Sequence, residues 1–160
     1  MKVYLSYAYG PLDGPIAARL RAVAAIYGIS ILLPDQTLIG KNLAAETEKL
    51  IKQSDAVIAL ISKFASRAAQ KNVERELQYA MQLGKPVIPM VEEPIKFSSL
   101  PNMTFVYFDR NNPARHEAEL LQVLNQIRTK KQKQDLTAVG WIAGIALGLL
   151  VLNQLTAETK

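Results

Sequence analysis

Residues 56–61, with the sequence AVIALI, form an unbroken apolar run, and this run constrains the fold more than any other feature of the chain. A strand that is apolar on both faces is typical of a parallel sheet covered by helices on each side. Four further strand patterns lie at 3–7, 29–33, 86–90 and 105–108, and helical spacing of apolar residues indicates helices over about 13–27, 42–51, 72–83 and 113–127. This alternation predicts an α/β fold with a flavodoxin-like, five-stranded, mostly parallel sheet and helices on both faces.

Several residues have an expected local role within these elements. We expect Asp13 and Asn42 to cap the first two helices, because their side chains can accept hydrogen bonds from free backbone N–H groups. We expect Pro86 and Pro89 to lie at strand ends, since proline cannot donate to a sheet ladder. We expect His116 on the polar, solvated side of the last helix.

The composition excludes several kinds of site. The chain has 160 residues and no cysteine, which excludes a disulfide scaffold, a zinc–cysteine site and a thiol nucleophile. A single histidine argues against a histidine metal cluster and a Ser–His–Asp triad. We therefore expect no metal and no bound cofactor. The basic residues before position 128 form no stripe along one face, so we expect no nucleic-acid partner.

The positive charge is concentrated in one short segment beside a long uncharged one. The segment 128–133 holds four basic residues and no acidic one, and residues 136–157 carry no charge. A helix over 136–157 would be about 33 Å long, which matches a bilayer core of about 30 Å. We therefore predict a domain at 1–127, a basic juxtamembrane linker at 128–135 and a single transmembrane helix at 136–157.

This interpretation predicts where the protein lies and how it assembles. The positive-inside rule places the N-terminal domain in the cytoplasm and makes the chain a single-pass membrane protein that binds a lipid bilayer. Gly140, Gly144 and Gly148 recur every four residues, a spacing that lets two helices pack closely in lipid, so we expect self-association through this face. The alternative is a C-terminal helix buried against the domain. We expect no signal peptide, because Met1 leads directly into the first strand pattern.

One acidic residue lies on the core-facing side of its predicted helix. At 100° per residue, Glu76 falls inside the apolar arc that contains Val73, Leu77 and Ala80. A carboxylate on that side is strongly unfavourable unless it is paired or opens into a cleft. Two interpretations stay open. Glu76 points into a ligand crevice, or it is a structural residue that pairs with an arginine or with backbone N–H groups.

The residues that follow the predicted strands are the first place to look for a ligand site. In parallel α/β sheets, ligands bind beyond the carboxyl ends of the strands. We expect substrate to contact residues at these ends and on the helix of Glu76. The expected substrate-binding residues are Ser6, Tyr7, Tyr9, Pro34, Asp35, Asn72 and Tyr79.

A lone carboxylate suits a particular reaction. Cleavage of a glycosidic bond with an activated leaving group passes through an oxocarbenium-like state, which a carboxylate stabilises or traps. The cationic nicotinamide of NAD needs no acid to leave, so NAD fits as a substrate, and not as a cofactor, without a metal or a base. We therefore predict that Glu76 is the catalytic residue.

Five segments in this order resemble a bacterial-type Toll/interleukin-1 receptor (TIR) domain. They are VYLSY at 3–7, GKNL at 40–43, SDAVIALIS at 54–62, NVERELQYA at 72–80 and PVIP at 86–89. The resemblance covers residues 1–127 and implies an NAD glycohydrolase or cyclase, an NAD+ nucleosidase, in immune-type signalling or antiviral defence. It implies that Glu76 is the catalytic glutamate, that Tyr7 and Tyr9 lie in a substrate-contacting loop, and that the domains self-associate. Asn72 departs from the pattern, because many members have tryptophan there.

Two other functions stay open. The segment ELQYA at 76–80, followed by LGKPV at 83–87, also resembles the nucleophile helix of nucleoside deoxyribosyltransferases, although SRAAQK at 66–71 replaces the usual aspartate-rich stretch. The other is a non-catalytic, membrane-tethered adaptor that binds other TIR domains.

Overall fold

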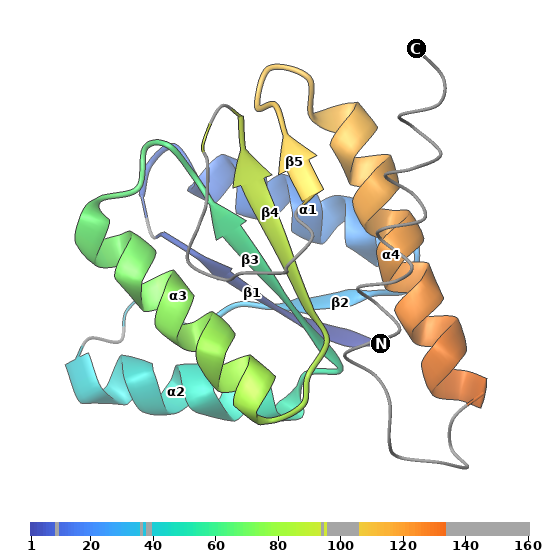
Figure 1. Ribbon diagram of the computed structural model, residues 1–160, viewed down its shortest axis with the longest axis horizontal. Coiled ribbons are helices and arrows are strands. Elements are labelled where there is room, and N and C mark those ends of the chain that lie inside the picture. The colour runs from blue at the N-terminus through green and yellow to red at the C-terminus, as the bar shows by residue number, and fades with distance from the viewer. Residues whose placement is uncertain (9, 36, 38–39, 94, 96–105, 134–160) are drawn as a thin grey trace.

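One five-stranded parallel sheet forms the centre of the fold (Figure 1). The computed structural model describes residues 1–8, 10–35, 37, 40–93, 95 and 106–133. The strand order is β2-β1-β3-β4-β5, and every neighbouring pair is parallel. The α/β, flavodoxin-like fold predicted from the sequence is confirmed. The strands are β1 Lys2–Tyr7, β2 Ser30–Leu32, β3 Ala56–Ile61, β4 Val87–Glu92 and β5 Val106–Phe108.

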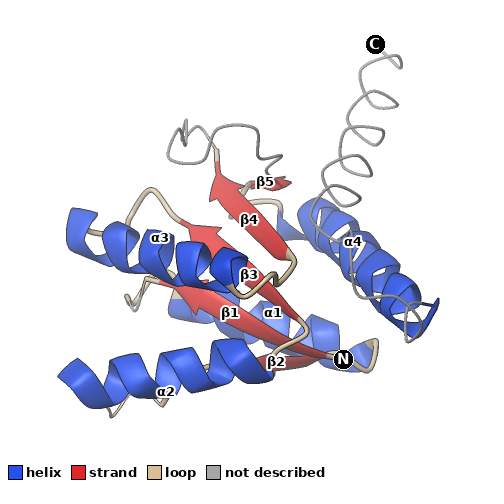
Figure 2. Cartoon of the chain, turned by 60° about the horizontal axis from the view of Figure 1, so that its bottom comes forward, coloured by secondary structure: helices blue, strands red, loops and turns tan. Residues whose placement is uncertain are grey.

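Helices cover both faces of this sheet, as predicted (Figure 2). The helices α1 (Gly14–Ile26) and α4 (Pro113–Lys133) lie on one face, and α2 (Gly40–Gln53) and α3 (Arg67–Gln82) lie on the other. All six residues of β3 are buried, because both of its faces are covered.

Two separate hydrophobic cores result, and β1 contributes to each. Val3 and Leu5 pack with the side chains of α1 and α4, whereas Tyr4 packs with those of α2 and α3. The alternation follows from the two-residue period of a strand. Ser6 therefore lies on the same face of the sheet as Tyr4, toward α3.

Two predicted helix starts differ from the structure, and one predicted cap bond is not made. The helix α3 begins at Arg67 and not near residue 72. Ser66 caps its first turn, its Oγ accepting from the Ala69 N–H at 3.2 Å. The prediction missed this start because the exposed first turns lack an apolar period. Asn42 lies inside α2, which begins at Gly40. Asp13 does precede α1, but its side chain makes no cap bond, because it pairs with Arg110.

Pro89 and His116 also differ from expectation. Pro89 lies within β4. The described pairing of β4 with β5 begins only at Met90, so Pro89 interrupts no described pair on that side. His116 is 9% exposed and therefore buried. It precedes Leu120 by four residues, so both side chains lie on the core-facing side of α4.

The basic segment forms the last turns of α4. The Arg128 guanidinium donates to the Tyr27 carbonyl oxygen at 3.0 Å, and the Lys131 ammonium pairs with Asp55. The side chains of Arg128 and Lys131 therefore contact the domain itself. Within the described residues, no helix combines the length and apolar character needed to cross a bilayer. The predicted transmembrane helix at 136–157, with its glycine face, lies outside those residues.

Candidate active site

The Glu76 carboxylate is held by two hydroxyl groups from the neighbouring strand. Ser6 Oγ donates to Glu76 Oε2 at 2.6 Å, and Tyr4 Oη donates to the same oxygen at 2.9 Å. Both donors are fully buried residues of β1. Among the described residues, no hydrogen bond is made to Oε1. The arrangement fixes one carboxylate oxygen and leaves the other available for a ligand.

Glu76 is placed there by its position on α3. Val73, Leu77 and Ala80 are buried against the sheet, and Glu76 shares their side of the helix, as the helical arc predicts. Burial raises the pKa of Glu76 above its ordinary value of 4.5, although the hydrogen bonds from Ser6 and Tyr4 and the charge of Arg75 oppose this effect. The carboxylate has no arginine bonded to it among the described residues. The structural alternative of a buried Glu–Arg pair is therefore wrong for this residue.

A cavity of about 780 Å³ opens beside Glu76. Its volume falls within the range of about 300–1,000 Å³ found for small-molecule sites. The walls come from the end of β1, from α2 and from α3. The lining residues are Tyr7, Ala8, Leu43, Ala44, Thr47, Glu48, Ile51, Ala69, Asn72, Arg75, Glu76, Gln78, Tyr79 and Gln82.

The cavity collects some of the predicted substrate-binding residues and not others. Tyr7, Asn72 and Tyr79 line it, and Ser6 lies directly behind Glu76. Pro34 is buried and Asp35 is exposed, and neither is among the described lining residues. The Asp35 carboxylate instead accepts from the Thr37 N–H and hydroxyl at 2.9 and 2.7 Å. These hydrogen bonds lower the pKa of Asp35. The predicted residue Tyr9 lies outside the described residues.

Three residues of the site were missed by sequence reasoning. The strand pattern at 3–7 predicts Tyr4 within a strand and assigns no role to its hydroxyl group. Tyr4 and Ser6 are two residues apart on β1, so the two-residue period of a strand would have placed both hydroxyl groups on the α3 face. Arg75 lines the cavity and accompanies Asn72, to whose side-chain oxygen its guanidinium donates. Thr47 is a buried polar residue of α2 that faces the cavity, and only the tertiary structure reveals its place.

A second ionic cluster joins the carboxyl ends of the strands. The guanidinium of Arg110, after β5, donates to both oxygens of Glu92 at 2.7 and 2.9 Å, to Asp13 at 3.1 Å and to the Leu12 carbonyl at 2.7 Å. Burial alone would raise the pKa of Glu92, but hydrogen bonds from Arg110 and the Lys63 N–H outweigh it and lower the pKa to about 2. This Arg110 cluster fixes the loop that follows β1.

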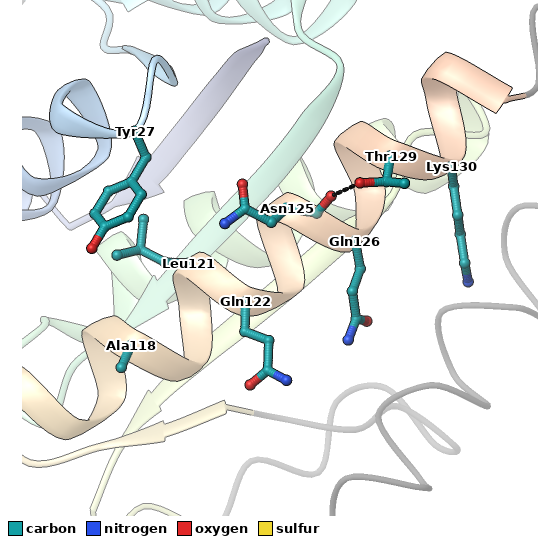
Figure 3. A pocket seen from close by; sticks show the side chains of 8 residues that line it. All are labelled: Tyr27, Ala118, Leu121, Gln122, Asn125, Gln126, Thr129 and Lys130. Atoms are coloured by element: carbon teal, nitrogen blue, oxygen red, sulfur yellow. Dashed lines mark hydrogen bonds between the residues drawn. The ribbon is translucent and has the colours of Figure 1, made fainter.

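A different hollow runs along the outer side of α4 (Figure 3). It has a volume of about 660 Å³ and includes Tyr27, Leu121 and Asn125 in its lining. None of its described lining residues is a carboxylate, so it lacks the group that defines the site at Glu76. In the described part of the chain, no group of three or more His, Asp or Glu residues could hold a metal ion.

The fold and the site define a class of protein. The chain is a flavodoxin-like α/β domain in which the half-buried carboxylate of Glu76, bonded by two hydroxyl groups, lies at the wall of a cavity. The sequence model of the TIR domain matches residues 3–124. The chain therefore belongs to the TIR domain family. A search of curated protein sequences gives no match.

Solved structures with a similar fold include both TIR domains and enzymes of nucleoside chemistry. The TIR domain of the Toll-related receptor TRR-2 from Hydra magnipapillata has a TM-score of 0.56 and 20% identity, and the match covers 79% of this chain and 97% of that one. The CMP N-glycosidase BcmB from Clostridium botulinum has a TM-score of 0.52 and 19% identity, over 78% of this chain and 99% of that one. Both likenesses establish the fold alone.

A 2-desoxiribosyltransferase from Leishmania mexicana is also similar. Its TM-score is 0.50 and its identity 26%, over 56% of this chain. The match spans only 63% of the length of that enzyme. The chain therefore has fold relatives in two groups, TIR domains and enzymes that act on nucleosides or nucleotides.

Proposed function

We propose that this TIR domain cleaves the bond between nicotinamide and ribose in NAD, with Glu76 as the catalytic carboxylate. The observation that carries the proposal is the Glu76 carboxylate itself, which two buried hydroxyl groups hold at the wall of a nucleotide-sized cavity. No described cation neutralises it by a hydrogen bond, so its negative charge is available to a ligand.

The chemistry follows from that charge. When the ribose–nitrogen bond breaks, both electrons pass to the pyridine nitrogen and neutral nicotinamide leaves, so no acid is required. The ribose carbon becomes an oxocarbenium-like cation, which an ionised Glu76 stabilises electrostatically or traps as an ester. Water then adds at that carbon and releases a proton, giving ADP-ribose. If a nitrogen of the adenine adds instead, the product is a cyclic isomer.

The other lining residues suit the remaining parts of a dinucleotide. Arg75 offers a cation for the pyrophosphate, because its side chain is exposed at the cavity. Tyr7 and Tyr79 offer aromatic surface to a ring. Asn72 supplies a polar group where many TIR domains have tryptophan, so the nicotinamide would have less aromatic contact.

A second candidate is cleavage of a nucleoside, as in a deoxyribosyltransferase. The observation in its favour is the likeness to the Leishmania mexicana 2-desoxiribosyltransferase at 26% identity. In that reaction the carboxylate would attack the sugar carbon and a base would leave. A non-catalytic adaptor is the third candidate, for which the Glu76 pair would be structural.

Two incubations separate these candidates. Purified full-length protein at high concentration is given NAD in one and 2′-deoxyadenosine in the other, and products are followed by chromatography. The proposal predicts nicotinamide from NAD and no adenine from the nucleoside. Adenine alone would support the deoxyribosyltransferase alternative, and no product from either would support the adaptor.

Matched variants identify the responsible carboxylate. Glu76→Gln keeps an oxygen for the Ser6 and Tyr4 hydroxyl groups but removes the charge, and we expect the rate to fall by about 10²–10⁴-fold. Glu74→Gln, two residues away on α3 and outside the described cavity lining, is the control and should keep the rate within about twofold. Equal rates in both variants would exclude Glu76 as the catalytic group.

We also propose that the chain is tethered to a membrane and self-associates. The support is the uncharged segment 136–157 beside the basic segment 128–133, with Gly140, Gly144 and Gly148 on one face. Tethering would raise the local concentration of TIR domains. The full chain should float with anionic lipid vesicles, and deletion of residues 136–160 should abolish flotation. Flotation that persists in the deletion variant, or full-length protein that stays unbound, would contradict the tether.

A further inference from the structure

Cationic residues from separate elements meet at one edge of the sheet, the amino edge, where the strands begin. The four described helices run in the direction opposite to the strands, so their last turns lie at this edge, on the side where β1 starts (Figure 1). Hydrogen bonds and one ion pair place five cationic residues there: Lys2, Lys52, Lys85, Arg128 and Lys131. None of the five is among the described residues that line the Glu76 cavity.

Asp55, just before β3, joins three of these residues. The Lys2 N–H donates to Asp55 Oδ2 at 2.8 Å, and the Lys131 ammonium pairs with Oδ1 of the same carboxylate. Burial lowers the pKa of Lys85, and the charges of Asp55 and Lys131 also act on it. The start of β1, the segment before β4 and the end of α4 therefore lie close together.

Lys85 and Arg128 also contact the ends of two helices. The Lys85 ammonium donates to the carbonyl oxygens of Lys52 and Ser54 at 3.0 and 2.7 Å, at the end of α2. The Arg128 guanidinium donates to the Tyr27 carbonyl oxygen at 3.0 Å, at the end of α1. Carbonyl groups at a helix end carry only a partial negative charge. These bonds therefore hold the two cations in place without cancelling their charge.

The amino edge carries an excess of positive charge. Among the ion pairs of the described residues, the pair of Lys131 with Asp55 is the only one that involves any of the five cationic residues. Glu48, one turn before Lys52 on α2, adds a second carboxylate. Even with Glu48 counted, five cations face two carboxylates, and an anionic partner would balance the difference.

Exposed apolar side chains accompany these cations. Ile26 and Tyr27, at the end of α1, are 80% and 47% exposed, and Leu83, just after α3, is 40% exposed. Cations combined with large apolar and tyrosine side chains are typical of surfaces that lie on an anionic bilayer. The phosphates of a nucleic acid would contact the cations but leave the apolar side chains without a partner.

The direction of the chain beyond α4 favours the same partner. The helix α4 ends with Lys133, so the described chain stops at the amino edge, and the uncharged segment 136–157 begins a few residues later. A basic surface alone binds a bilayer only weakly, but a second anchor in the same chain raises its local concentration at the lipid.

We propose that the amino edge is a docking surface for the anionic headgroups of the bilayer that holds the tether, so that the domain lies with the carboxyl ends of its strands directed away from the lipid. This inference rests on the proposed tether and is independent of the chemistry at Glu76. Docking leaves the end of β1 at the Glu76 cavity open to a substrate from solution.

A label at each edge of the sheet measures this orientation in the full chain. The chain has no cysteine, so one introduced cysteine takes a single bimane label. Gln53→Cys places the label at the amino edge, and Ala68→Cys places it in the first turn of α3, at the opposite edge; both positions are exposed. On phosphatidylcholine–phosphatidylserine vesicles with a nitroxide on some headgroups, the label at residue 53 should lose more of its fluorescence than the label at residue 68.

Matched charge variants test the electrostatic basis. Lys2→Gln/Lys52→Gln removes two exposed cations from the amino edge, and each loss should weaken docking by about fivefold, so most of the difference between the two labels should disappear. Arg67→Gln/Lys71→Gln makes the same change of charge at exposed positions near the start of α3 and should keep the difference. Vesicles of phosphatidylcholine alone should also abolish it.

The outcomes separate failure of docking from failure of the tether. Full-length protein that does not float with the vesicles would contradict the tether, and the docking with it. Protein that floats but shows equal quenching at both labels, or a difference that persists in Lys2→Gln/Lys52→Gln, would overturn the docking alone. Equal quenching together with binding of a labelled DNA duplex that these two substitutions abolish would assign the surface to nucleic acid instead.

Discussion

Glu76 combines a burial that disfavours its charge with two hydroxyl groups that favour it. Burial has the larger effect and raises its pKa, while Ser6 and Tyr4 act in the opposite direction. A nucleophilic or electrostatic role requires the ionised form. Under the proposed function, the balance between these effects controls what fraction of the protein holds Glu76 ionised, and therefore active, at a given pH.

The first prediction concerns the acid limb of activity. Nicotinamide release should decline as the pH falls through the raised pKa of Glu76, because protonation removes the charge that stabilises the ribose cation. Ser6→Ala removes a bond that lowers this pKa, so its acid limb should move to higher pH and its plateau rate should fall by about tenfold. Ser30→Ala, an exposed serine on β2, is the control. An unchanged limb in Ser6→Ala would argue against Glu76 as the titrating group.

The second prediction concerns stability at the same residue. A raised folded-state pKa means that the folded protein binds the proton more tightly than the unfolded chain, so wild-type stability declines as the pH rises from about 4.5 through that pKa. Glu76→Gln lacks this decline. We compare the free energy of unfolding of Glu76→Gln in urea with that of wild type at each pH. The value for the variant minus the value for wild type should be larger at pH 7 than at pH 4. A variant less stable than wild type by more than about 1 kcal/mol at pH 7 would indicate a structural role for the charge.

At the scale of the elements, α3 carries both a wall of the cavity and the Glu76 carboxylate. Its first turns hold Ala69 and Asn72 at the cavity, and Ser66 caps them. The cap therefore supports the site as well as the helix.

The third prediction tests that cap. Ser66→Ala should lower the free energy of unfolding by about 1 kcal/mol, and Ser66→Asp, which can accept the same N–H bond, should restore it. Urea unfolding followed by circular dichroism measures both. If the two variants are equally destabilised, the capping bond is not what stabilises this helix end.

The elements also show how far the sequence alone leads. The apolar run at 56–61, the other strand patterns and the helical periods predicted the sheet and its covering helices, and the period around Val73 predicted the inward direction of Glu76. A strand buried on both faces and a helix buried on one face each leave a distinct pattern of apolar residues. The start of α3 was missed, since exposed turns have no apolar period. The α2 wall with Thr47, and the Arg110 cluster, depend on contacts between segments far apart in the chain, which no local pattern encodes.

At the scale of the molecule, the Arg110 cluster connects the β1–α1 loop with the ends of β3 and β4 and the residues after β5. Arg110 reaches Leu12, Asp13, Ser62 and Glu92, and its guanidinium lies 4.7 Å from the centre of the Phe64 ring. Glu92 is 1% exposed, so its carboxylate is shielded from water.

The fourth prediction is an acid-dependent loss of stability through this cluster. Because the folded-state pKa of Glu92 is lowered to about 2 from 4.5, its contribution is present above about pH 4.5 and is lost as the pH falls toward 2. The loss should amount to about 3 kcal/mol for wild type. Arg110→Gln should be less stable by about 3–5 kcal/mol at pH 7.

The double variant Arg110→Gln/Glu92→Gln isolates the pair. Its free energy of unfolding should exceed that of Arg110→Gln alone, because Glu92 is no longer left as a buried charge without Arg110, whereas Asp13 loses Arg110 in both variants. Additive effects of the two substitutions would show that the residues do not act together.

The most direct test of the central claim is the ratio of initial rates of nicotinamide release from NAD by wild type and by Glu76→Gln at pH 7, with folding of both checked by circular dichroism. A ratio of about 10²–10⁴ with both proteins folded is the result expected if a hydroxyl-bonded carboxylate stabilises the ribose cation. A ratio near one, or no nicotinamide from the wild type, would contradict it.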